Sequence, residues 1–130
     1  MTTNDTPLVL LHGFLGCADD FAPLAEQLAR RIRCIAVDLP GHGHAPAAVT
    51  ATDFATGLAV IRQQLADLGT ERCHLLGYSM GGRIALGLAA AHPETVATAI
   101  AIGASAGITD GPSRSERRAA DLALADHLES

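Results

Sequence analysis

A serine flanked by glycines constrains the fold of this chain more than any other feature of its sequence. The segment Gly77-Tyr78-Ser79-Met80-Gly81 follows the apolar run 73–76 and precedes a helical pattern that extends to about residue 91. A sharp strand-to-helix turn of this kind holds its serine in unfavourable backbone angles, and the glycines let strand and helix approach closely. The hydroxyl then projects over the sheet edge, beside the positive end of the helix. Ser79 is therefore a candidate nucleophile, and this context disfavours an ordinary glycine-rich turn.

Short apolar runs alternate with longer amphipathic runs along the rest of the chain. The alternation predicts strands at 8–11, 34–37, 73–76 and 96–102, and helices at about 19–30, 53–68, 80–91 and 114–129. Four residues at helical spacing are expected on the buried face of the second helix: Leu58, Ile61, Leu65 and Leu68. Residues 107–115, rich in Gly, Ser, Asp and Pro, are expected to form a loop. Strands that alternate with helices in this way predict an α/β fold with a parallel sheet of about four strands.

Composition and charge argue against several classes of function. The net charge of −5 argues against a nucleic-acid partner, because phosphate binding requires a basic face. No apolar run reaches the ~20 residues that span a bilayer, and segment 1–5 lacks the basic residues of a signal peptide. Cys17, Cys34 and Cys73 are widely spaced, which predicts unpaired buried thiols in a reducing compartment instead of a zinc or redox site. We therefore expect a cytoplasmic protein that binds no membrane and needs no metal or other cofactor.

Two further motifs follow predicted strands, so they are expected at the same sheet edge as Ser79. The segment His12-Gly13-Phe14-Leu15-Gly16 can aim the Phe14 N–H at the point that the Met80 N–H also faces. Two such donors form an oxyanion hole; the alternative is a connecting loop without a role. The segment Asp38-Leu39-Pro40-Gly41-His42-Gly43 is expected to be a structural turn, because no cluster of cysteines or carboxylates accompanies its histidine.

The arginines near this edge leave two interpretations open. Arg83 lies four residues after Ser79, one helical turn further on, so it can face the same pocket. Three more lie on the last predicted helix: Arg114, Arg117 and Arg118. From spacing alone, the favoured interpretation for all four is a solvated side chain, which is the usual state of a surface arginine.

These motifs resemble those of the α/β-hydrolase superfamily and, within it, the 2-succinyl-6-hydroxy-2,4-cyclohexadiene-1-carboxylate synthases of menaquinone biosynthesis. The resembling segments are 12–16, 38–43 and 77–83, and Arg114-x-x-Arg117-x-x-x-Asp121 resembles the arginine-rich segment that opens the family's helical cap. The resemblance covers nearly the whole chain and implies a partial α/β-hydrolase fold. It makes residues 1–106 the N-terminal part of the hydrolase core and residues 107–130 the start of the helical cap.

The resemblance implies a lyase and a small anionic substrate, a cyclohexene carboxylate with a succinyl group and an enolpyruvyl ether. A base removes a proton beside the succinyl carbonyl, Ser79 relays that proton with the help of a histidine, and pyruvate is eliminated. The implied site residues are catalytic Ser79, the oxyanion-hole amides of Phe14 and Met80, and substrate-binding Tyr78, Arg83 and Arg117. Arginine forks suit the carboxylates of such a substrate.

The chain matches only the serine of the family's catalytic triad. In the family the order is Ser, Asp, His, and the last two follow the cap. His74, His92 and His127 are poor substitutes at their predicted positions, and a serine without a base is a weak nucleophile or relay. We therefore expect an inactive fragment that needs a missing C-terminal half, or that self-associates through an exposed sheet edge. Two alternatives remain open: an esterase fragment of the same superfamily, and a truncated non-catalytic pseudo-enzyme.

Overall fold

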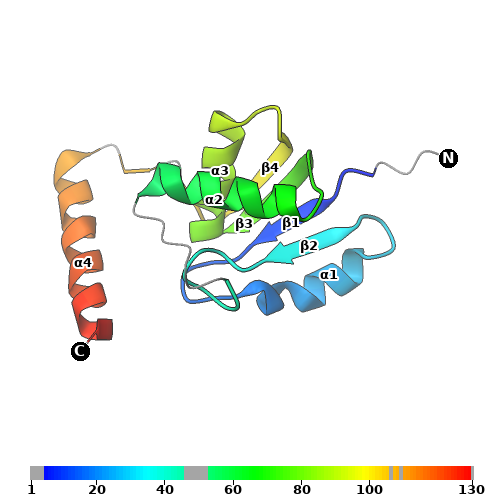
Figure 1. Ribbon diagram of the computed structural model, residues 1–130. Helices are drawn as coiled ribbons and strands as arrows, with labels where there is room; N and C mark the ends of the chain where they lie inside the picture. Colours follow the sequence, from blue (N-terminus) through cyan, green and yellow to red (C-terminus); the bar gives the residue numbers. More distant parts are fainter. Residues whose placement is uncertain (1–4, 46–52, 106, 109, 130) are drawn as a thin grey trace.

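Four parallel strands form the centre of the molecule (Figure 1). The computed structural model describes residues 5–45, 53–105, 107–108 and 110–129. The strands are β1 (Leu8–Leu11), β2 (Cys34–Val37), β3 (Cys73–Tyr78) and β4 (Val96–Ile102). Their order in the sheet is β2-β1-β3-β4. The predicted parallel four-stranded sheet is confirmed, and β3 extends two residues further than expected, up to the turn that carries Ser79.

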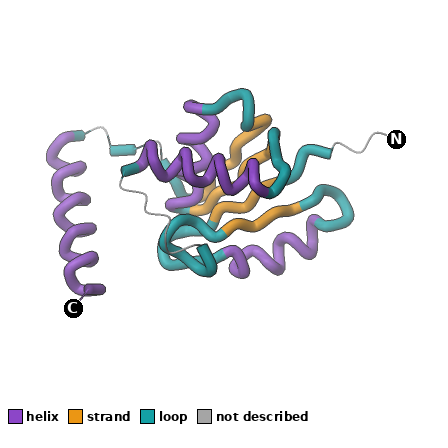
Figure 2. The backbone as a smooth tube through the Cα atoms, in the orientation of Figure 1, coloured by secondary structure: helices purple, strands orange, loops and turns teal. Residues whose placement is uncertain are grey.

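The helices cover the two faces of this sheet unequally. They are the short 3-10 helix η1 (Ala18–Phe21) and the α-helices α1 (Ala22–Leu28), α2 (Phe54–Asp67), α3 (Met80–Ala91) and α4 (Gly111–Glu129). Figures 1 and 2 show α1 on one face, α2 and α3 on the other, and α4 standing apart from the sheet. No described helix is both long enough and apolar enough to cross a lipid bilayer.

The main core lies between the sheet and the pair α2 and α3. Alternate residues of the strands point into it, among them Val9, Leu11 and Leu75, all fully buried. Helix α2 contributes Leu58, Ile61 and Leu65 at helical spacing, as predicted. The expectation for Leu68 is wrong: its side chain is 52% exposed. Leu68 is the residue at which α2 ends, so the chain has already left the helical path that would turn it inward.

The expected loop over residues 107–115 is also partly wrong, because α4 begins at Gly111. The Asp110 carboxylate accepts a hydrogen bond from the Ser113 N–H at 2.8 Å, and its carbonyl accepts one from the Arg114 N–H at 3.0 Å. Asp110 thereby caps the helix. Pro112 lies in the first turn, where a missing N–H costs nothing. Residue 109 of the expected loop lies outside the described residues.

Candidate active site

Ser79 stands on a strained turn between β3 and α3. Its backbone angles are φ 54° and ψ −114°, a region that side-chain-bearing residues adopt at a cost of about 1–3 kcal/mol. Its N–H donates to the Ile102 carbonyl of β4 at 2.8 Å, and its carbonyl accepts from the Arg83 N–H at 3.1 Å. The neighbouring strand and the first turn of α3 therefore hold the strained residue in place. This is the sharp turn that the glycine–serine motif predicts.

The two glycines of the motif are required by close backbone packing. A Cβ atom on Gly77 would overlap the Gly81 carbonyl group, and one on Gly81 would overlap the carbonyls of Leu11 and His12. The start of α3 therefore packs directly against the end of β1. This contact places the loop after β1, which carries Phe14, next to Ser79.

The loop after β1 has a second strained residue, Leu15, with φ 62°. Leu15 and Ser79 are the only described residues other than glycine with positive φ. The Leu15 N–H donates to His42 Nε2 at 3.1 Å, and His42 Nδ1 donates to the Pro40 carbonyl at 3.1 Å. The Phe14 ring meets the His42 ring edge-on, with centroids 5.9 Å apart. His42, which the sequence assigned to a structural turn, thus holds the loop of the candidate oxyanion hole.

His12 also links the loop after β1 to the loop after β2, but it does so from a buried position. Its side chain is buried, Nδ1 donates to the Gly13 carbonyl at 2.8 Å, and Nε2 accepts from the Leu39 N–H at 3.0 Å. Both ring nitrogens have a hydrogen-bond partner, which fixes the orientation of the ring. The sequence analysis assigned no role to His12 itself, because its partner Leu39 lies 27 positions away along the chain.

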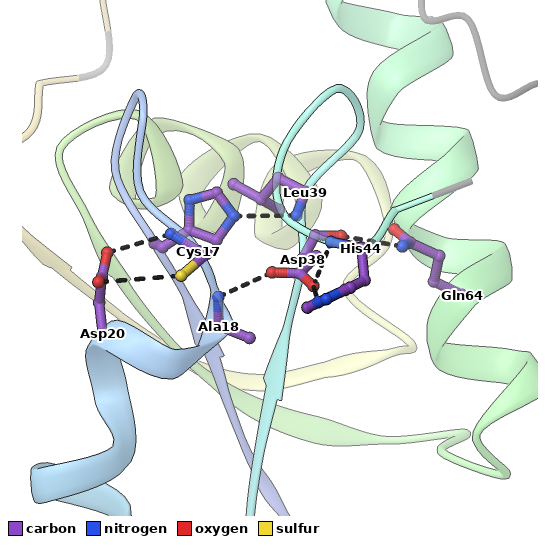
Figure 3. Close-up of polar contacts among 8 residues, drawn as sticks. Cys17, Ala18, Asp20, Asp38, Leu39, His44 and Gln64 are labelled. Carbon is purple, nitrogen blue, oxygen red and sulfur yellow. Dashed lines mark hydrogen bonds and ion pairs between the residues drawn. The ribbon is translucent and has the colours of Figure 1, made fainter. Parts of the chain in front are cut away.

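Asp38 ties the loops after β1 and β2 together (Figure 3). One carboxylate oxygen accepts from the Ala18 N–H at 2.8 Å, and the other accepts from the His44 N–H at 2.9 Å. These hydrogen bonds, from Ala18 first and then from His44, hold the pKa of the Asp38 carboxyl below its ordinary value. The Gln64 amide of α2 donates to the Asp38 carbonyl at 3.0 Å. A structural role, as predicted for this segment, accounts for each of these contacts.

A cavity of about 660 Å³ lies between the sheet edge and α4. Ser79, Phe14 and Met80 line it together, so the three residues of the predicted nucleophile and oxyanion hole lie around one space. Met80 is the first residue of α3, so its N–H has no acceptor within the helix. Arg83, on α3, and Arg117, on α4, line the same cavity. Five of the six predicted site residues therefore meet here.

Tyr78 is the sixth, and the structure places it elsewhere. Its ring packs against Gly13 and Gly103 at the end of the sheet, and its side chain is 54% exposed. It is not among the residues that line the Ser79 cavity. Side chains alternate between the two faces of a strand, so Tyr78 lies on the same face of the sheet as His74 and Leu76. Ser79 follows the strand and lies in the turn, so its side chain does not share that face.

No histidine of the described residues lines the Ser79 cavity. His74 Nδ1 is 2.7 Å from the Thr98 hydroxyl on the sheet, and His92 Nδ1 is 3.4 Å from the Glu94 carboxylate at the far end of α3. Among the described residues, the predicted nucleophile and oxyanion-hole residues line this cavity, and no histidine lies beside them in it. The described residues also contain no group of three or more His, Cys, Asp or Glu side chains that could hold a metal ion.

The parallel sheet, the strained serine and the loop after β1 together define the class of protein. The chain matches the α/β hydrolase fold over residues 6–129, and it belongs to that family. Within the family its similarity to 2-succinyl-6-hydroxy-2,4-cyclohexadiene-1-carboxylate synthases is evident. It is 34% identical to the Salmonella typhimurium synthase over 114 residues, which cover 88% of this chain and 44% of the synthase.

One solved structure and one further relative also resemble this chain. The structure of MenH from S. aureus superposes with a TM-score of 0.86 at 32% identity, covering 96% of this chain and 47% of that one. A pimeloyl-[acyl-carrier protein] methyl ester esterase from Aeromonas hydrophila is 38% identical over 75% of this chain and 37% of the esterase. The chain spans less than half the length of each of these relatives.

Proposed function

We propose that this chain forms the serine-bearing half of a lyase that eliminates pyruvate, as 2-succinyl-6-hydroxy-2,4-cyclohexadiene-1-carboxylate synthase does. The observation that carries the proposal is that Arg83 and Arg117 line the same cavity as Ser79. A serine hydrolase needs the serine and two amides, but a substrate with several carboxylates also needs cations beside them. The arginines therefore favour an anionic substrate over a neutral ester.

In the proposed reaction, a base outside these residues draws the Ser79 proton, and Ser79 in turn accepts the proton beside the succinyl carbonyl. The electrons of that C–H bond pass into the ring system, and the C–O bond to the enolpyruvyl group breaks. Pyruvate leaves with that oxygen as its enolate and takes up one proton, so that the proton removed from the ring is returned to the leaving group. The amides of Phe14 and Met80 stabilise the negative charge that develops on the succinyl carbonyl oxygen. The arginines hold carboxylates and orient the ring.

The segment that completes the site is the proposed partner. It would supply the acid and the histidine of the triad and would cover the open side of β4. The proposal places the protein in the cytoplasm, because Cys17, Cys34 and Cys73 are all unpaired. Burial raises the pKa of the Cys73 thiol to about 11, so it is an inert core side chain.

Ester hydrolysis is the second candidate, and the similarity to the Aeromonas hydrophila esterase favours it. A chimera can separate the two: this chain followed by the C-terminal part of the Salmonella typhimurium synthase. In the chimera, Arg83→Gln with Arg117→Gln is expected to lower kcat/KM for pyruvate release at least about 100-fold, because two charge-assisted contacts are lost. Hydrolysis of a neutral ester without any release of pyruvate would instead establish the esterase.

A further inference from the structure

Within the described residues, three hydrogen bonds from a backbone N–H to a side chain join the loop after β1, up to the start of η1, to the loop after β2. In each of them the acceptor is a side chain that can take up a proton, so this junction depends on the protonation of its acceptors. The three pairs are Leu15 N–H to His42 Nε2 at 3.1 Å, Leu39 N–H to His12 Nε2 at 3.0 Å, and Ala18 N–H to the Asp38 carboxylate at 2.8 Å.

The hydrogen bond between Leu15 and His42 exists only while the His42 ring is neutral. A backbone N–H can only donate, so His42 Nε2 must accept and cannot carry a proton. The proton of the neutral ring then lies on Nδ1, which donates to the Pro40 carbonyl at 3.1 Å. A second proton would occupy Nε2 and point at the Leu15 N–H, so protonation of His42 breaks this bond.

His42 is partly exposed, so protons from solvent reach its ring directly. From the loop after β1, the buried His12 ring faces it with centroids 5.1 Å apart. From η1, the Asp20 carboxylate binds the Cys17 N–H of that same loop at 3.1 Å. These groups and the neighbours of His42 in its own loop, Asp38 and His44, are the titratable groups around the junction.

Asp38 and His44 respond to pH differently from His42. Hydrogen bonds from the Ala18 N–H and then the His44 N–H hold the pKa of the Asp38 carboxyl below its ordinary value (Figure 3). Asp38 therefore stays ionised over the pH range in which histidines titrate, and its bond to Ala18 persists. The His44 side chain is 96% exposed, and its Nδ1 lies 3.7 Å from Asp38. Its ring accepts no backbone N–H from the loop after β1.

Loss of the bond to His42 acts on a strained backbone. Leu15 has φ 62° and its side chain is 69% exposed, so little packing opposes its relaxation. Phe14 directly precedes it, and the N–H of Phe14 is the predicted donor of the oxyanion hole. A change in the backbone at Leu15 therefore changes the direction of the Phe14 N–H beside Ser79.

We propose that His42 is a pH-dependent latch, a side chain that holds the oxyanion-hole loop while neutral and releases it when protonated. Above the histidine range the neutral ring accepts the Leu15 N–H and the loop is held. As the pH falls through that range, Nε2 takes up a proton from solvent, the hydrogen bond breaks and the loop is released. The inference deepens the proposed function, on which it rests for the role of the Phe14 amide.

Amide hydrogen exchange of the 130-residue chain, measured by NMR at about pH 7.5 and about pH 5, tests the latch. Each rate is divided by the rate of an unstructured peptide at the same pH, which removes the intrinsic pH dependence of exchange. Protection of the Leu15 amide is expected to fall about tenfold at the lower pH, the factor that corresponds to one lost hydrogen bond. Protection of the Ala18 amide should stay constant, because Asp38 remains ionised.

His42→Gln separates the latch from a purely structural role. The amide oxygen of glutamine can accept the Leu15 N–H at either pH, so protection of Leu15 should no longer change with pH. His44→Gln is the matched control, since it removes the exposed histidine of the same loop. This control should keep the tenfold fall of the wild-type chain.

Each other result has a definite meaning. Equal protection of Leu15 at both pH values in the wild-type chain would overturn the latch, and so would an equal fall in His42→Gln. Loss of the fall in His44→Gln would assign it to His44 and reject the latch. A Leu15 amide unprotected at both pH values in His42→Gln would still assign the wild-type fall to His42. Because none of these measurements involves pyruvate, their failure leaves the proposed function standing, and a chimera that releases no pyruvate leaves the latch standing.

Discussion

Among the described residues, backbone strain from positive φ at a residue other than glycine occurs at Ser79 and Leu15, and both lie at the candidate site. Each has a positive φ, and each is held by a hydrogen bond from its own N–H to a distant partner, Ile102 or His42. The sequence predicted the first, because glycines flank Ser79 and follow an apolar run. It could not predict the second, because Leu15 follows no local rule and depends on a histidine 27 residues away.

At the same scale, the acid sensitivity of the fold is expected to depend on Asp38. Its pKa is lower in the folded protein than in the unfolded chain, so its contribution is complete above the unfolded pKa. The contribution is lost as pH falls through the folded pKa. Asp38→Asn is therefore expected to lower the free energy of unfolding by about 1 kcal/mol at pH 7, since hydrogen bonds to a charged group are weakened.

Urea denaturation of wild type and Asp38→Asn at pH 7 and pH 3 measures this difference. The difference in free energy of unfolding between the two proteins should narrow as the pH is lowered, because protonation of the wild-type carboxyl removes its charge. Asp19→Asn, at an exposed position of η1, is the control and should show no such change. If this difference in free energy of unfolding stays constant or widens on acidification, the stabilising role of the Asp38 carboxylate is contradicted.

At the scale of elements, periodicity located every strand and the whole of α3. Periodicity did not locate the end of α2 or the start of α4, because capping residues determine where these helices begin and end. Asp110 caps α4 and starts a helix within a Gly-Pro-Ser segment that resembles a loop. Leu68 kept the spacing of its helix but lies at its end, so it is exposed. The resemblance put Arg83 and Arg117 in one site, but residue spacing alone could not show that both line one cavity, because that depends on where α4 lies relative to α3.

The packing of α3 on β1 gives the prediction for this scale. Gly81→Ala is expected to lower the free energy of unfolding by about 1–3 kcal/mol, because the added methyl group overlaps the carbonyls of Leu11 and His12. Gly111→Ala is the matched control, since a Cβ there meets nothing within 4 Å. Chemical denaturation of both variants measures the effect, and similar values for the two would contradict the packing account.

On the scale of the whole molecule, β4 is one of the two edge strands of the described sheet, and β2 is the other. Strand β4 pairs only with β3 among the described strands, and Ile100 and Ile102 are about half exposed on its outer face. Edge strands with exposed apolar side chains associate with other chains. In longer relatives, of which this chain covers less than half, additional chain is available to cover such a surface.

We therefore expect the isolated chain to self-associate through this surface. Ile100→Lys should shift the population towards monomer, because it places a charge on the outer face of β4. Leu68→Lys is the matched control: it changes an equally exposed apolar residue at the end of α2 and should leave association unchanged. Sedimentation velocity over a range of concentrations measures the distribution. A wild-type chain that remains monomeric throughout would reject the expectation.

We propose that Ser79 is the reactive residue of a pyruvate-eliminating site that these residues only partly supply. Pyruvate release tests it most directly, measured with the 130-residue chain alone, with the synthase chimera, and with the chimera carrying Ser79→Ala. We predict no release by the chain alone, release by the chimera, and a fall of at least about 100-fold on loss of the Ser79 hydroxyl, in line with the usual contribution of a proton-transfer group. Pyruvate release by the chain alone, or equal release by the chimera with and without Ser79, would contradict the account.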